Sequence, residues 1–154
     1  MERLISAFIL GFFAMFPVGQ SAAEDLAKRQ SPFSVAETMD RFQAKVEGRG
    51  LPILLRINHG REGNEAGVAL RPVEIAIFGA VEPSARFIAR NGAIGIDMPL
   101  RLVVWEEEDG SVWAGAISAD AFAERWGLPK DDPQIQRMRM AVDSLLTMAT
   151  SEGG

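Results

Sequence analysis

The chain has 154 residues, of which 47% are hydrophobic and 24% charged, and this balance is typical of a single globular domain with a real core. Its formal net charge of −5, with basic residues scattered among acidic ones, argues against a protein that tracks nucleic-acid phosphates. The absence of cysteine excludes disulfides, thiolate metal sites and a thiol nucleophile.

Residues 1–23 have the pattern of a Sec signal peptide. Arg3 precedes an apolar run at residues 4–16, which is too short for an ordinary transmembrane helix, and small residues at 21–23 form a cleavage site. We expect cleavage after Ala23, export to the periplasm or beyond, and no stable membrane anchor afterwards. The alternative is an uncleaved N-terminal anchor. Residues 24–32 are polar and expected to be flexible, although Leu26 and Ala27 are able to join an edge strand.

Residues 33–150 are expected to form one domain that begins with a helix. Ser34 and Glu37 form a capping box, and an apolar stripe at helical spacing follows as far as Gly48. Alternating apolar residues predict strands at 53–58 and 73–78. The intervening residues 61–67 are expected to be a loop or a single helical turn.

The second half continues with a short helix that starts near Pro83, then an irregular segment. Residues 101–118 predict a hairpin around the turn signal Asp109-Gly110, with Trp105 and Trp113 facing each other or lying diagonally. A short helix and a final helix capped by Asp132 follow, and residues 151–154 are expected to be a disordered tail. Strands that are mostly adjacent in sequence favour an α+β fold, with an antiparallel sheet and helices on one face.

Few residues could carry chemistry. The chain lacks the HExxH, GxSxG, phosphate-loop and GxGxxG patterns, and its single histidine, His59, excludes a multi-histidine zinc site within one chain. His59 follows a predicted strand, where it could act as a general base, ligate a metal or haem, or bond loop backbone as a structural residue. The methionines are expected to pack in the core rather than bind copper.

Two further polar residues are worth testing with His59. Arg71 could bind a carboxylate or pair with Asp97, and Asp97 could instead cap a turn by accepting from nearby amides. If His59, Arg71 and Asp97 converge, they would form a small polar pocket able to bind an anion or transfer a proton.

The order of short motifs resembles a bacterial family known as domain of unknown function 302. The motifs are "RINH", "LRP", "IFG", "GIDMPL", "VVWEEEDGSVW" and "AERWGL", spread over roughly residues 33–128. The resemblance implies a β-α-β(4)-α-like fold grouped with TATA-box-binding-like proteins, commonly dimeric, and it implies no activity. The final helix extends beyond the matching region and could cover the sheet or pair with another chain.

The chain departs from the family pattern at two places. Residues 80–83 are Ala-Val-Glu-Pro where the family usually has Asn-Pro-Lys, so a positive charge becomes negative. Residues 125–127 are Arg-Trp-Gly where the family often has Arg-His-Gly. The first departure weakens any anion site that relies on that lysine, and the second removes a possible second histidine.

Taken together, these features predict an exported small binding or accessory protein of unknown ligand that forms a homodimer. Its candidate pocket lies around His59, Arg71 and Asp97. The alternative is a haem or transition-metal protein that uses His59 as a ligand. A weaker alternative is a small enzyme with His59 as general base, because no nucleophile–base pair is visible in the sequence.

Overall fold

The computed structural model describes residues 25–152, which form five strands, five α-helices and one short 3-10 helix. The predicted signal peptide lies outside the described residues, as do residues 153–154 of the predicted tail. In chain order the elements are β1 (Leu26–Ser31), α1 (Val35–Glu47), β2 (Ile53–Asn58), α2 (His59–Glu65), β3 (Val73–Phe78), α3 (Val81–Ile88), η2 (Gly92–Ile96), β4 (Arg101–Glu106), β5 (Val112–Ile117), α4 (Ala119–Arg125) and α5 (Pro133–Thr150).

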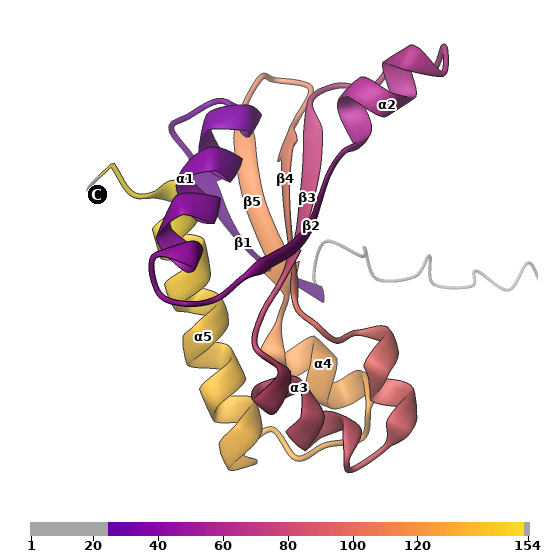
Figure 1. Cartoon of the computed structure of the whole chain (residues 1–154), viewed down its shortest axis with the longest axis vertical. Coiled ribbons are helices and arrows are strands. Elements are labelled where there is room, and N and C mark those ends of the chain that lie inside the picture. The colour runs from indigo at the N-terminus through magenta and orange to yellow at the C-terminus, as the bar shows by residue number, and fades with distance from the viewer. Residues whose placement is uncertain (1–24, 153–154) are drawn as a thin grey trace, which may run out of the picture.

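The strands form one antiparallel sheet in the order β1-β5-β4-β3-β2. The first strand pairs with the last, so α1 leads the chain from one edge of the sheet to the other. Figure 1 shows α1 and α5 on one face of this sheet. The predicted α+β class, with a β-α-β(4)-α-like order and an additional C-terminal helix, is confirmed.

Local signals explain where the two long helices begin. The Ser34 hydroxyl accepts a hydrogen bond from the backbone N–H of Glu37 at 3.2 Å, as the capping box predicts. The Asp132 carboxylate accepts one from the backbone N–H of Gln134 at 2.7 Å. Each bond satisfies an N–H group that has no partner within its own helix.

The core lies between the sheet and the layer of α1 and α5. Phe42 of α1 meets Phe78 of β3 edge-on, with ring centroids 4.9 Å apart. Phe87 of α3 meets Phe122 of α4 in the same way at 5.0 Å. The predicted apolar stripe of the last helix is buried, which confirms that α5 covers the sheet: Ile135, Met138, Val142, Leu145 and Ala149.

Two expectations about ordered structure need correction. Residues 26–31 are not a flexible segment, because they pair with β5 along their whole length, from Leu26 opposite Ile117 to Ser31 opposite Val112. Leu26 and Ala27 do join an edge strand, as the sequence allowed. Charged residues on an edge strand hide it from pattern reading, since an edge faces solvent. Within the predicted tail, the Ser151 hydroxyl lies 3.3 Å from Lys45 Nζ and accepts its hydrogen bond.

The face of the sheet opposite α1 and α5 is mainly apolar, with Lys28 and Gln30 at the β1 edge and Arg101 at the start of β4. In Figure 1 no helix of the described part lies over it. Trp105 and Trp113 face each other there across the hairpin. A Cβ added at Gly115 would come within 3.0 Å of the Trp105 ring, so this glycine makes room for the indole. We call this surface the open sheet face; its apolar members are Leu55, Ile57, Val73, Ile75, Ile77, Val103, Trp105 and Trp113.

Candidate functional site

His59 is the first residue of α2, directly after β2. Its side chain is exposed. Asn58 caps this helix by accepting a hydrogen bond from the backbone N–H of Arg61 at 2.8 Å. The next residue, Gly60, packs so tightly that a Cβ would lie 2.9 Å from the carbonyl oxygen of Arg71. The histidine therefore stands on an exposed turn that is anchored through its neighbours.

Arg71 lies at the same end of the sheet as His59, just before β3. Its guanidinium is half-exposed, and Nη1 lies 3.7 Å from Oε1 of Glu108 in the β4–β5 turn. The predicted pairing with Asp97 does not form. An exposed ion pair of this length contributes little to stability, because water screens both charges.

Asp97 is held in a different place by different partners. Its carboxylate accepts a hydrogen bond from Trp126 Nε1 at 2.8 Å and lies 3.3 Å from Arg125 Nε. The side chain is only 11% exposed. These contacts tie the segment after η2 to the end of α4, and they replace the predicted capping of a turn by nearby backbone amides.

The structure does not bring the three predicted residues together. His59 and Arg71 flank the beginning of β3, whereas Asp97 belongs to the segment that approaches its far end, where Phe78 N–H donates to the carbonyl oxygen of Leu100. The six residues of β3 separate the two positions by roughly 17 Å at about 3.3 Å per residue. The polar pocket expected around all three residues is therefore absent from the described part of the chain.

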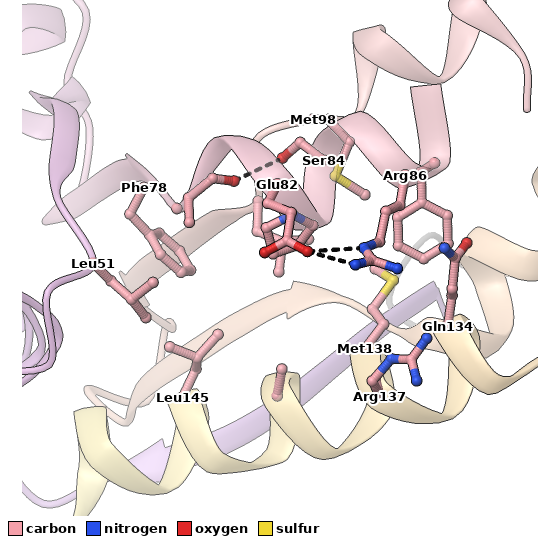
Figure 2. A pocket seen from close by; sticks show the side chains of 16 residues that line it. Leu51, Phe78, Glu82, Ser84, Arg86, Met98, Gln134, Arg137, Met138 and Leu145 are labelled. Atoms are coloured by element: carbon pink, nitrogen blue, oxygen red, sulfur yellow. Dashed lines mark hydrogen bonds and ion pairs between the residues drawn. The ribbon is translucent and has the colours of Figure 1, made fainter. Parts of the chain in front are cut away.

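A cavity with a volume of about 530 Å³ lies elsewhere, between α3 and α5. We call it the α3–α5 cleft. Figure 2 shows Leu145 and Met138 of α5 on one side of it, with Phe78 and Leu51 nearby. Its apolar lining consists mainly of Leu51, Phe78, Met98, Leu100, Met138 and Leu145.

Polar side chains gather around this apolar lining. Glu82 and Arg86, four residues apart on α3, form an ion pair at 2.5 Å, and the hydrogen bond from Arg86 lowers the pKa of the Glu82 carboxyl. The Ser84 hydroxyl donates to the Ala80 carbonyl oxygen at 3.4 Å. Arg137, from α5, also lines the cleft. The cleft is thus an apolar hollow with cationic groups contributed by both helices.

The departure from the family pattern at residues 80–83 falls at this cleft, because Ala80, Glu82 and Pro83 all line it. The negative charge introduced there is already engaged by Arg86. Arg137 was not singled out from the sequence. A weak signal existed, since Arg137, Ala141 and Leu145 are spaced by four residues and so lie on one face of a helix.

The arrangement of acidic and histidine side chains gives no support for a metal site. Among residues 25–152 no group of three or more histidine, aspartate or glutamate side chains could hold a metal ion. Ligation of haem or a metal by His59 stays a prediction. Three of the methionines, Met39, Met138 and Met148, are buried in the core as expected, whereas Met140 is 65% exposed.

Comparison with protein families identifies a match over residues 27–145 to the model described as "Domain of unknown function DUF302". The fold resembles the crystal structure of an uncharacterized conserved DUF302 protein from Bacillus stearothermophilus. The TM-score is 0.71 and the sequence identity 17%, covering 81% of this chain and 98% of that one. This second likeness concerns the fold alone.

Curated relatives include proteins named "Fluoride-specific ion channel FluC 1" from Brucella suis biovar 1 (strain 1330) and Brucella abortus biovar 1 (strain 9-941). Each is 33% identical over 112 residues, which is 73% of this chain. The match spans 44% of the first protein and 42% of the second, so the chain covers less than half of their length. In the described part of this chain, no helix combines the length and apolarity needed to cross a membrane.

Proposed function

Because the chain belongs to the family described as domain of unknown function DUF302, whose description assigns no activity, we propose its function from the α3–α5 cleft: it is a small-molecule binding module. The observation that carries this proposal is the cavity of about 530 Å³ with a mainly apolar lining and a few polar groups. Small-molecule sites are typically concave, mostly apolar and roughly 300–1,000 Å³ in volume.

A binding role fits the cleft better than catalysis. Enzymatic nucleophiles need a base within hydrogen-bond reach, and the single histidine lies outside the residues that line the cleft. Ser84, the hydroxyl residue among them, contacts a backbone carbonyl instead. We therefore place the protein with accessory and carrier modules rather than with enzymes.

Site-directed blocking of the cleft tests this proposal. We expect decan-1-ol to shift the amide NMR signals of cleft residues such as Gly79 and Ala141 in the chain that begins at Glu24. Ala141→Phe, which adds a ring on the cleft side of α5, should abolish the shifts. Met140→Phe places the same ring on the neighbouring position of α5, which is exposed, and should leave them intact. If the signals of the native chain stay unchanged up to the solubility limit of the alcohol, the binding function is refuted.

We further propose that the module is exported and works outside the cytoplasm. The support is the pattern of residues 1–23, and the mass of protein recovered from the periplasmic fraction should correspond to a chain starting at Glu24. The Brucella relatives are named as channels, but this chain covers less than half of their length, so we propose an accessory role for it and no channel activity.

We also propose that two copies pair through the open sheet face. Strand spacing of about 4.8 Å and a rise of about 3.3 Å per residue give this face roughly 24 by 20 Å. When the areas of two such faces are added and the uneven surface of their side chains is included, the buried area approaches ~1,200 Å². This is the area that the smaller specific interfaces bury. The two tryptophans, Trp105 and Trp113, suit such a surface, because aromatic residues are enriched at the centre of interfaces.

A further inference from the structure

The charges at the α3–α5 cleft indicate what kind of molecule it takes. We infer that the ligand is a single-chain amphiphile with a carboxylate head, whose tail lies on the apolar lining and whose head is bound by Arg137. This inference rests on the proposed binding function and adds the chemical class of the ligand.

Arg137 differs from every other arginine in residues 25–152. It is the one whose side chain has no hydrogen bond, ion pair or ring contact within that range. The arginines nearest to it in the cleft and on α5 are engaged: Arg86 by Glu82 at 2.5 Å, and Arg139 by Asp120 at 2.5 Å. A guanidinium left unpaired beside a cavity is available to a ligand.

The balance of charge at the cleft also favours an anion. Arg86 and Arg137 carry two positive charges and Glu82 one negative charge, so the ionised lining is positive by one. The whole chain has a formal net charge of −5, so this local excess is not a reflection of a basic protein. The positive lining attracts an anion at short range although the chain as a whole is negative.

Geometry and chemistry then select a carboxylate with an apolar tail. Arginine presents a planar fork of N–H donors that matches the two oxygens of a carboxylate. Next to an apolar wall the attraction is less screened than in open water. Figure 2 shows Arg137 on the same helix as Met138 and Leu145, so a head bound to this arginine has apolar surface beside it for its tail.

Three probes with a decyl-type tail test the inference: decanoate, decan-1-ol and decyltrimethylammonium. Each is titrated by calorimetry at pH 7, the two ions below their micelle concentrations and the alcohol below its solubility limit. We expect decanoate to bind about tenfold more tightly than the alcohol, as one charge-assisted contact of about 1.4 kcal/mol requires. The cationic probe should bind most weakly. Arg137→Gln should bring decanoate to the level of the alcohol and leave the alcohol unchanged.

Arg139→Gln is the matched control, because it removes a charge two residues away that is already paired with Asp120. It should change none of the three affinities. Glu82→Gln offers a second measurement, since it releases Arg86: decanoate should bind more tightly and decan-1-ol equally well.

The outcomes separate the two proposals. If the alcohol binds as tightly as decanoate, or if Arg137→Gln leaves their ratio unchanged, the carboxylate inference is wrong and the binding module stands. The inference would also be overturned if Glu82→Gln raised the affinities for decanoate and for decan-1-ol equally. If no probe binds to the native chain, the binding function fails and the inference fails with it.

Discussion

At residue 60 the backbone of α2 comes so close to the segment before β3 that no side chain fits. A Cβ there would lie 2.9 Å from the carbonyl oxygen of Arg71 and 3.0 Å from the backbone nitrogen of Val73. Backbone atoms cannot yield as a flexible side chain can. We expect Gly60→Ala to lower the free energy of unfolding by about 1–3 kcal/mol through overpacking. Urea denaturation followed by circular dichroism measures it.

Gly92→Ala is the control for that substitution, because a Cβ at Gly92 meets no atom within 4 Å. It should leave the urea midpoint unchanged or raise it slightly, since alanine restricts the unfolded chain. Equal losses in the two variants would show that α2 is not held against Arg71 in the way described.

Glu74 is a buried charge whose partners are all on the covered face. Its carboxylate accepts hydrogen bonds from Arg56 Nε at 2.7 Å and from Asn58 Nδ2 at 3.0 Å, and its side chain is 5% exposed. Glu74→Gln keeps the shape but removes the charge, and we expect a loss of about 1.5–3 kcal/mol in unfolding free energy. Glu37→Gln, at the exposed pair with Arg41, should cost under about 0.5 kcal/mol. A loss at Glu74 no larger than at Glu37 would contradict this assignment.

The candidate site shows what single residues reveal in a sequence. The position of His59 directly after a strand was predictable, because alternation ends at Asn58. The separation of His59 from Asp97 was not predictable, because the pairing register of β3 decides which loops lie at the same end of the sheet. Arg137 was missed because an isolated arginine on a helix resembles any solvated charge; its lack of a partner is visible only in three dimensions.

At the scale of elements, the sequence predicted what local contacts determine. The capping box at Ser34 and the cap at Asp132 are signals within four residues of each helix start, and both helices begin there. β1 has no such signal, because its hydrogen bonds come from β5, far along the chain. An edge strand rich in charge looks like a loop until its partner is known.

The start of α5 also predicts how stability depends on pH. The Asp132 carboxylate accepts a hydrogen bond from Arg90 Nη2 at 2.6 Å, and this bond, with the backbone bond from Gln134, holds the pKa of Asp132 below its ordinary value. A carboxyl whose pKa is lowered by folding stabilises the protein above its unfolded-state pKa of about 3.9 and loses that contribution as the pH falls through its folded value.

Asp132→Asn isolates this effect, since asparagine caps helices about as well as aspartate. The native chain should be more stable than the variant at pH 7, and the difference should shrink steadily below about pH 4. Asp131→Asn removes the adjacent charge without touching the bond to Arg90 and should show no such convergence. Urea midpoints between pH 7 and pH 3 provide the comparison. A difference that stays constant over this range would rule out the ion pair as its source.

At the scale of the whole molecule, the antiparallel class followed from strands that are neighbours in sequence, whereas the place of β1 did not. Only the family resemblance implied a β-α-β(4)-α-like order, because nothing local says that the first strand pairs with the last. The open sheet face was equally hidden. Apolar residues on both sides of β3 and β4 indicate a doubly covered sheet, yet the described helices cover only one side. An exposed apolar surface of this kind is typical of an interaction site.

Pairing through that face makes a prediction about the whole assembly. Val103 lies near its middle, between Ile75 and Gly115 on the neighbouring strands. In a two-fold interface a central residue meets its own copy or a close neighbour of it, so Val103→Lys places two like charges together without water. Such a juxtaposition costs several kcal/mol, and we expect dissociation of the dimer to rise more than a hundredfold. Each chain should stay folded, since the face is then solvated.

Sedimentation velocity of the chain that begins at Glu24, over a range of concentrations, measures this shift. Met140→Lys is the matched control: Met140 lies on the outer surface of α5 and is 65% exposed, so a lysine there should leave the dimer intact. The two variants also separate the two surfaces that could join copies of this chain. If Met140→Lys separates the copies and Val103→Lys does not, then α5 pairs with another chain and the open sheet face is covered by something else. If the native chain sediments as a monomer at every concentration, neither surface joins two copies.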